Sequence, residues 1–580
     1  MQQGIAWLEE HFDMDFSGID MESIEYERKC QFFYKLAVTL FAQEQRHIQS
    51  KFENLGIMVD CARNGVPNIP TLKRLIASLA LSGYSYVGLY LEDCFEVEEE
   101  PLFGYMRGRY TKSEIKEVVE FADMFGIEVV PYIQTLAHLP RLFNHWVPYC
   151  TQVRDTNDIL LMGEPRTYLL IEHMVKAISE SFGKGRINIG MDEAFMMTYG
   201  KYRQIHGDSN VCQVFSKHVE KVCEICDKYG MKPEVWADMF LHYKDEIRVP
   251  ENLVLRAWEY DATDGSYYTN LVNDCKTISN KVTFGGTAQR FYGYVPLNGY
   301  AEPIYSAAIK GLEGYTDDFC LTLWGDDGSE CSVNAMWYSM LRVGNQAHNE
   351  VLNEVELDKL ALCITGYKME ELLAMDLPNY VFEGPMKKPV NVSKYMLFSD
   401  VFMGLAEKTE NPIYVQYFKQ HGKRLKKLSK RKAPCAYLYR VFACLCEILE
   451  VKNNLRQQIR KAYHAGDKEA LSHITKYELP YIIRKLNKFC VLIEEQWVTD
   501  YKVLGLEVQI YRLHGLVARV KYIKKTLERY CFGELEKIAE LEETDLSPLP
   551  DPNAEHNGAT YFNSFEQNIT YCNLSHHVYL

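Results

Sequence analysis

The stretch "TKSEIKEVVEFADMFGIEVVPYI", residues 111–133, places a helix directly before a strand. Thr111 with Glu114 three residues later is the capping box of a helix start, and Gly126 is a residue that commonly ends a helix. The next seven residues, 127–133, are mostly β-branched or aromatic, which favours a strand. This succession predicts the repeating unit of an α/β protein.

The same alternation continues between residues 55 and 345. Apolar runs predicted as strands lie at 56–60, 85–92, 127–133, 186–191, 233–239, 253–258, 281–286 and 319–324. Helix-period segments separate these runs, and eight strands that each precede a helix are typical of a (β/α)8 TIM barrel. A doubly wound sheet usually has a Gly-rich phosphate turn after its first strand, where this chain has "DCARNGVP". We therefore predict the barrel.

Beyond the barrel, long helical periods predict an α-helical C-terminal domain over residues 350–545. In 506–530, Leu506, Ile510, Leu513, Val517 and Val520 form one apolar stripe, and 437–459 has similar spacing. The basic run 423–432 fits the solvated face of an amphipathic helix. We predict a mostly helical segment at 1–54, the catalytic barrel at 55–345 and a loosely ordered tail at 546–580.

Charge and composition limit the partners. The 580 residues carry a formal net charge of −15, which argues against a nucleic-acid or anionic-membrane partner. The start shows no secretory signal, and no apolar run is long enough to span a bilayer. The 17 scattered cysteines are interpreted as reduced, mostly buried thiols of a cytoplasmic protein. The apolar C-terminal helices make a homodimer plausible.

Polar and aromatic residues collect at the predicted strand ends, where TIM barrels carry their chemistry. These residues are Asp60, Arg63, Glu92, Asp93, His138, Asp192, Glu193, Trp236, Asp238, Trp258, Glu259, Tyr292, Tyr294, Trp324, Asp326 and Asp327. Three of the chain's seven tryptophans are among them. Tryptophan faces with acids and an arginine suit a sugar, whose C–H face packs on the ring while its hydroxyls bind charged groups.

Two other kinds of site are less consistent with the sequence. Several carboxylates and a histidine could hold Mg²⁺ or Zn²⁺, but the strand ends contain no HxH or HExxH pattern. A serine hydrolase would need a GxSxG turn, which is absent. We therefore expect neither a metal nor a cofactor.

Five motifs in order resemble glycoside hydrolase family 20, the exo-β-N-acetylhexosaminidases. They are "CARN" (61–64), "YIQTLAHL" (132–139), "GMDEAF" (190–195), "VWADMF" (235–240) and "LTLWGDDGSE" (321–330). The C-terminal segments resemble the branch with a helical C-terminal domain, so the likeness covers roughly residues 55 to 545.

The resemblance implies a retaining reaction in which the substrate's own 2-acetamido oxygen attacks the anomeric carbon and forms an oxazolinium. It implies that Glu193 protonates the leaving oxygen, that Asp192 stabilises the oxazolinium, and that a tyrosine holds the acetamide oxygen. Tyr292 and Tyr294 are both possible for that tyrosine, and Tyr294 is expected. The substrate would carry a terminal β-linked GlcNAc or GalNAc. The residues that the resemblance assigns to substrate binding are Arg63, His138, Trp236, Trp258, Tyr292, Trp324 and Asp326.

Two alternatives remain open from the sequence. A two-carboxylate glycosidase would use Glu193 with Asp238 or Asp326 and would not need the acetamide. A non-catalytic barrel would only bind sugar.

Overall fold

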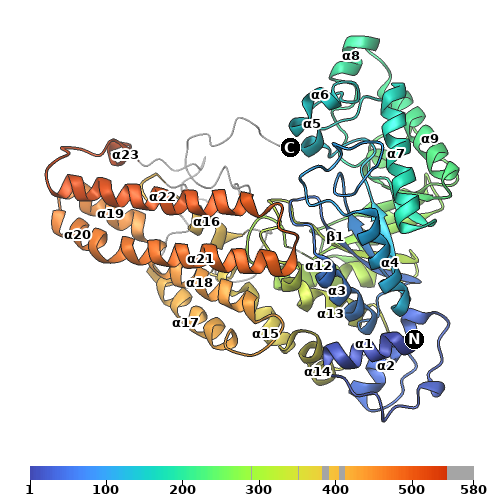
Figure 1. Cartoon of the computed structure of the whole chain (residues 1–580), viewed down its shortest axis with the longest axis horizontal. Helices are drawn as coiled ribbons and strands as arrows, with labels where there is room; N and C mark the ends of the chain where they lie inside the picture. The colour runs from blue at the N-terminus through green and yellow to red at the C-terminus, as the bar shows by residue number, and fades with distance from the viewer. Residues whose placement is uncertain (289, 350–351, 382–390, 404–411, 545–580) are drawn as a thin grey trace. The chain divides into compact units, whose positions relative to one another are not determined.

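The computed structural model describes residues 1–288, 290–349, 352–381, 391–403 and 412–544. The predicted tail at 546–580 lies outside these residues. The chain divides into two compact units, coloured along the sequence in Figure 1. The first contains residues 1–288, 301–324 and 339–364. The second contains 289–300, 325–338 and the chain from 365 onward.

The first unit is a closed barrel of eight parallel strands in sequence order, so the predicted TIM barrel is confirmed. The strands are β1 (Asn54–Asp60), β2 (Tyr86–Tyr90), β3 (Glu128–Tyr132), β4 (Arg186–Asn188), β5 (Lys232–Trp236), β6 (Val254–Trp258), β7 (Val282–Thr287) and β8 (Asp318–Leu323). β1 closes the barrel because it pairs with β2 on one side and with β8 on the other. The predicted strands at 186–191 and 233–239 are too long, since β4 ends at Asn188 and β5 at Trp236.

Helices cover the outside of this barrel. They include α3 (Ile69–Leu81), α4 (Lys112–Phe125), α7 (Pro165–Phe182), α9 (Val211–Lys228), α11 (Gly265–Lys276), α12 (Asn298–Leu312) and α13 (Trp337–Gln346). Near the N-terminus, α1 (Gln2–Phe12) and α2 (Lys29–Ala42) belong to the same unit. Helix α4 has the predicted ends: Thr111 and Glu114 form a capping box, and Gly126 has φ 71°. In Figure 1, α4 and α7 are neighbours on the outside of the sheet.

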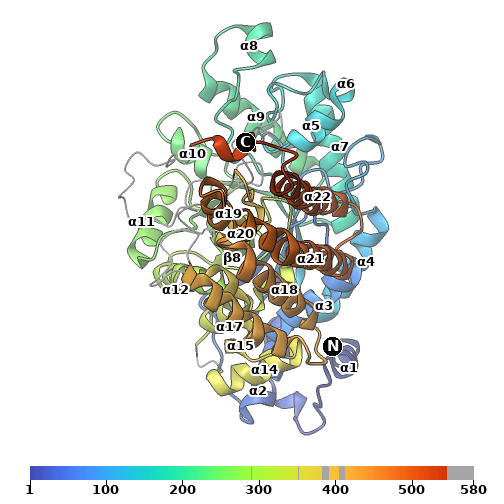
Figure 2. The same cartoon turned by 90° about the vertical axis from the view of Figure 1, so that its left-hand side faces the viewer.

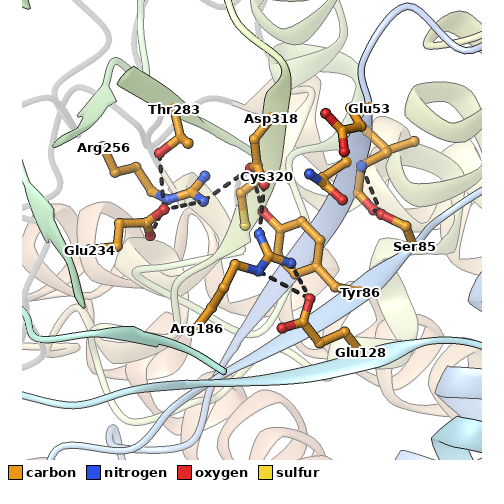
Figure 3. Close-up of polar contacts among 12 residues, drawn as sticks. Glu53, Ser85, Tyr86, Glu128, Arg186, Glu234, Arg256, Thr283, Asp318 and Cys320 are labelled. Atoms are coloured by element: carbon orange, nitrogen blue, oxygen red, sulfur yellow. Dashed lines mark hydrogen bonds and ion pairs between the residues drawn. The ribbon is translucent and has the colours of Figure 1, made fainter. Parts of the chain in front are cut away.

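Charged side chains fill the barrel interior where the strands begin (Figure 3). Arg256 on β6 is 1% exposed and donates hydrogen bonds to Glu234 at 2.6 Å and to Asp318 at 3.0 Å. Asp318 also accepts from Arg186 at 2.7 Å and from Tyr86 at 2.8 Å. Branched apolar side chains usually fill this position in TIM barrels. Here a network of paired charges links β2, β4, β5, β6 and β8 at the end of the barrel opposite the strand carboxyl ends.

The second unit is helical, as predicted. Its larger helices are α17 (Pro412–Leu428), α18 (Ala436–Lys452), α19 (Leu455–His464), α21 (Leu479–Asp500) and α22 (Leu506–Cys531). Helices α17, α18, α21 and α22 pack in succession (Figure 2). The predicted helical segment 437–459 is interrupted between α18 and α19.

The side-chain patterns of this unit partly follow the sequence. On α22, Leu513, Val517 and Val520 are buried as expected, whereas Ile510 is 37% exposed. In the basic run, Leu425 is buried while its lysine neighbours are exposed, so the amphipathic interpretation is confirmed. No helix in the described ranges combines the length and the apolar character needed to cross a membrane.

Candidate active site

The acid pair lies in a strained turn after β4. Gly190, Met191 and Glu193 have φ values of 75°, 69° and 52°, the left-handed region that costs energy for residues other than glycine. This backbone separates the environments of the two acids: the Asp192 side chain is 12% exposed and that of Glu193 is 53% exposed. Strained residues cluster at functional sites, so the turn marks this strand end as a candidate site.

Asp192 is held through both of its carboxylate oxygens. Gln134 Nε2 donates to Oδ1 at 2.7 Å, and His138 Nε2 forms an ion pair with Oδ2 at 3.1 Å. Gln134 also accepts the backbone N–H of Met191 through Oε1, at 3.0 Å, which ties the turn to the loop after β3. Burial alone would raise the pKa of Asp192, but His138 and Gln134 outweigh it and lower that pKa. Asp192 is therefore an ionised carboxylate fixed in place.

His138 faces both acids. Its Nε2 lies 3.1 Å from Asp192 Oδ2 and 3.5 Å from Glu193 Oε2. Burial lowers the pKa of His138, but the charge of Asp192 more than compensates, with a smaller contribution from Asp158, and the pKa rises to about 10. At neutral pH the ring is an imidazolium that balances the negative charge of Asp192.

Asp238, at the start of α10 (Asp238–His242), supports the acid pair from the next strand end. Its Oδ2 accepts the backbone N–H of Glu193 at 2.8 Å, and its Oδ1 lies 3.5 Å from Trp258 Nε1, which donates to it. Burial, followed by the charge of Asp192, raises the pKa of Asp238 to about 7. Asp238 thus fixes the backbone of Glu193 and links it to β6.

Aromatic rings form a continuous wall beside the acids. The rings of Trp236 and Trp324 are 6.1 Å apart, and those of Trp258 and Tyr260 are 5.0 Å apart. Trp324 Nε1 donates to the Tyr260 hydroxyl at 2.9 Å, which joins the two pairs. Trp236 is 1% exposed, and its indole N–H has no partner among the described residues. A buried donor without a partner in such a wall suits a ligand that brings an acceptor.

Arg63 closes the wall on the side of β1 and β2. Its Nη1 lies 3.4 Å from Glu92 Oε1 and 3.5 Å from Asp60 Oδ2. The guanidinium lies 5.0 Å from the ring centre of Tyr90 and 5.1 Å from that of Trp324. Glu92 has φ 45°, and burial raises the pKa of its carboxyl although Arg63 opposes the shift. This corner therefore offers a fixed cation and two acceptors to a polar ligand.

The structure brings most of the predicted site residues together. Seven of them lie at the strand ends of the first unit: Arg63, His138, Asp192, Glu193, Trp236, Trp258 and Trp324. Tyr292, Tyr294 and Asp326 belong to the second unit. There Tyr294 is buried, and its hydroxyl donates to Gln509 Oε1 at 3.0 Å. The roles predicted for these three residues stay predictions.

Sequence reasoning missed two members of the site and undervalued a third. Gln134 stands inside the quoted motif "YIQTLAHL", and Tyr260 follows Trp258 by two residues, so both positions were near strand ends. Gln134 is a neutral amide, a residue type absent from the list of charged and aromatic strand-end residues. Tyr260 was passed over although its neighbours Trp258 and Glu259 were selected. Asp238 was considered only as a second catalytic carboxylate. Within the described ranges, no group of three His, Cys, Asp or Glu side chains could hold a metal ion.

Comparisons with known proteins identify two domains of one enzyme family in this chain. Residues 52–281 match the glycosyl hydrolase family 20 catalytic domain, and residues 371–560 match the glycoside hydrolase 20C C-terminal domain. A probable beta-hexosaminidase of Arthroderma benhamiae is 25% identical over 317 residues, which cover 49% of each chain. Human hexosaminidase D is 24% identical over 207 residues, covering 34% of this chain and 43% of the relative.

The chain spans about half the length of the curated relatives it matches. Among solved structures, a beta-N-acetylhexosaminidase from Bacteroides fragilis aligns with a TM-score of 0.46 at 16% identity, over 62% of this chain and 80% of that one. The two domain matches are consecutive along the chain and belong to the same family. The chain therefore belongs to glycoside hydrolase family 20.

Proposed function

We propose that the protein is an exo-acting, retaining β-N-acetylhexosaminidase that removes terminal GlcNAc or GalNAc by substrate-assisted catalysis. One observation carries the proposal. A buried, ionised Asp192 is held at both oxygens beside a tryptophan wall, while the next residue, Glu193, exposes half of its side chain. Two adjacent carboxyls in such different surroundings suit two different tasks.

Asp192 suits the acetamide of the substrate. With one oxygen bonded to Gln134 and the other paired with His138, its carboxylate is positioned to keep a charge in place. In the reaction, the acetamide oxygen attacks the anomeric carbon as the glycosidic C–O bond breaks, and positive charge develops on the resulting oxazolinium. Asp192 accepts the acetamido N–H and stabilises that charge. Trp236 and Trp324 would pack against the acetamide and the sugar face.

Glu193 suits the proton transfers. Its exposed side chain can reach the glycosidic oxygen, which takes the proton as it leaves with its electron pair. The resulting Glu193 carboxylate then takes a proton from water, and that water opens the oxazolinium at the anomeric carbon with net retention. His138, 3.5 Å from Glu193 Oε2, steadies the negative charge that remains on Glu193 after the first transfer.

The same observations argue against a two-carboxylate mechanism. Asp238 accepts the backbone N–H of Glu193, and its pKa of about 7 leaves much of it protonated at neutral pH, where a nucleophile must be ionised. When the acetamide of the sugar is the nucleophile, the mechanism needs no second carboxylate for that role.

Two tyrosines besides Tyr292 are candidates for holding the acetamide oxygen. Tyr294 is the residue expected from the resemblance, and its hydroxyl is bonded to Gln509. Tyr260 is a second candidate because it contacts both Trp258 and Trp324 in the aromatic wall.

We also retain the predictions of a cytoplasmic location and of a homodimer.

Hydrolysis of p-nitrophenyl N-acetyl-β-glucosaminide tests the proposal. We expect Glu193→Gln and Asp192→Asn each to lower kcat by roughly 10²- to 10⁴-fold. Glu224→Gln is the matched control, since Glu224 is 66% exposed on α9 and pairs only with Lys221 in the described chain. A glucosaminide without the acetyl group should resist the wild-type protein. Equal cleavage of the acetylated and deacetylated substrates would instead support a carboxylate nucleophile, and activity that survives both substitutions would refute the site.

A further inference from the structure

The turn that follows Glu193 exposes large apolar side chains. Phe195 is 54% exposed, Met196 55% and Tyr199 59%. A single exposed apolar residue is ordinary, but three within five positions form a local patch, and such patches often mark binding sites. The patch begins two residues after the proposed catalytic acid.

Buried neighbours and backbone hydrogen bonds hold the turn that carries this patch. Ala194 and Met197 of the same turn are 0% exposed. Asp155 binds the end of the turn, accepting the backbone N–H of Thr198 at 3.0 Å and that of Tyr202 at 2.7 Å. The apolar side chains that face solvent therefore project from an anchored backbone, which would lose little freedom on binding a ligand.

Helix α10 joins the patch to the catalytic acid. Asp238 at its start accepts the backbone N–H of Glu193, and His242 at its end packs edge-on against Phe195, with ring centres 5.7 Å apart. Figure 2 labels this short helix. The acid and the apolar patch therefore keep a fixed geometry relative to each other.

The proposed reaction determines what must lie next to Glu193. This step rests on the proposed function: a general acid touches the glycosidic oxygen, and the leaving group is bonded to that same oxygen. The terminal sugar lies at Asp192 and the tryptophan wall. The leaving group must then extend over the exposed side of Glu193, and Phe195 is within about 7 Å along the chain, since two residues span at most that distance.

We propose that Phe195, Met196 and Tyr199 form an aglycone platform, a subsite that binds the leaving group of the substrate through apolar contact. The ligand class is an uncharged leaving group with an apolar face, either an aryl group or the C–H face of a second sugar. Aromatic rings stack on both. The contact is made in the ground state and in the transition state alike, so it acts mainly on KM.

The experiment compares three substrates that share the terminal sugar and differ in the leaving group. They are N-acetyl-β-glucosaminyl fluoride, p-nitrophenyl N-acetyl-β-glucosaminide and N,N′-diacetylchitobiose. The fluoride has no group that can reach the platform. For the double variant Phe195→Ala with Met196→Ala, we expect kcat/KM to fall about 5- to 30-fold with the aryl and sugar leaving groups, from the apolar area lost. With the fluoride it should stay within about twofold, as should inhibition by a thiazoline that fills only the terminal-sugar site.

Two further variants serve as controls. Phe195→Leu preserves apolar bulk and should retain most of the activity on all three substrates. Leu169→Ala on α7, where Leu169 is 46% exposed, is the matched control and should change none of them.

An equal loss with the fluoride would overturn the platform, because the damage would then be to the terminal-sugar site or to the fold. A loss confined to chitobiose would also overturn it, because a sugar is the leaving group that depends most on the catalytic acid. Unchanged kcat/KM with the aryl and sugar leaving groups would also overturn it, while leaving the proposed function intact. A wild-type protein that cleaves none of the three substrates would refute the proposed function itself and the platform with it.

Discussion

Replacing His138 by glutamine isolates the effect of one positive charge on the acid pair. Glutamine keeps a hydrogen-bond donor of similar reach, whereas the imidazolium charge 3.1 Å from Asp192 is lost. Burial, the largest influence on Asp192, favours its protonated form, and the main opposing influence is His138. We therefore expect the pKa of Asp192 to rise in the variant.

The size of the shift follows from the geometry. An opposite charge within about 4–6 Å changes a carboxyl pKa by roughly 1–3 units. The acidic limb of the pH profile reports the ionisation of Asp192, so it should move upward by about that amount. At a pH on the acidic limb of both profiles, a shift of that size would lower kcat/KM, relative to each protein's own plateau, roughly 10- to 10³-fold below wild type.

The assay is kcat/KM between pH 3 and 9 with the aryl glycoside. His173→Gln serves as the control, because His173 pairs with Glu100 at 2.9 Å outside the candidate site. An acidic limb that stays within about 0.3 units of wild type in a folded His138→Gln protein would refute the assignment of Asp192 as the charge held by His138.

The pH dependence of thermal stability provides an independent test of the charge on His138. The pKa of His138 is raised from its ordinary value to about 10, so its stabilising effect is fully present below about pH 6.5 and is lost as pH rises through 10. The difference in Tm between wild type and His138→Gln should accordingly be largest at pH 6 and narrow at higher pH.

Five further substitutions, at four positions, test other parts of the structure. Arg256→Met should destabilise the barrel by about 3–5 kcal/mol in urea unfolding, because it leaves the buried carboxylate of Glu234 without its cation. A loss below about 1 kcal/mol would show that the network is dispensable. Asp238→Ala should lower kcat about 5- to 150-fold, because the backbone N–H of Glu193 loses its acceptor and the acid is no longer held in place, and Asp238→Asn should lower it less. Tyr260→Phe and Tyr294→Phe test which tyrosine holds the acetamide oxygen. The variant that lacks this hydroxyl should lose roughly 10²- to 10³-fold in kcat. Wild-type activity in both variants would exclude both residues.

The sequence predicted the barrel because its signals are local. Each strand is a short apolar run, and helix ends such as Thr111 and Gly126 are set by neighbouring residues. The positions of Trp236, Trp258 and Trp324 at one end of the barrel followed from strand order alone. The partner of Tyr294 did not, because Gln509 lies more than two hundred residues further along the chain and no local pattern connects them.

The strand lengths around the acid pair show a second limit. The apolar run predicted a strand as far as Met191, but β4 ends at Asn188. Gly190, Met191 and Glu193 adopt left-handed backbone instead. Residue type gives little warning of this conformation in Met or Glu. It is maintained by contacts from other strand ends, Gln134 on the N–H of Met191 and Asp238 on that of Glu193.

These contacts explain how two neighbouring acids can share one strand end. Side by side on a regular strand, Asp192 and Glu193 would point to opposite faces of the sheet, and only one could face the barrel mouth. The left-handed turn allows both to meet His138, at 3.1 and 3.5 Å, while leaving one buried and the other half exposed. The cost of the strained backbone is offset by the bonds from Gln134 and Asp238. Because this backbone fixes where each side chain starts, the double exchange Asp192→Glu with Glu193→Asp moves both carboxylates by about one methylene, and it should abolish hydrolysis of the aryl glycoside although the charge is unchanged.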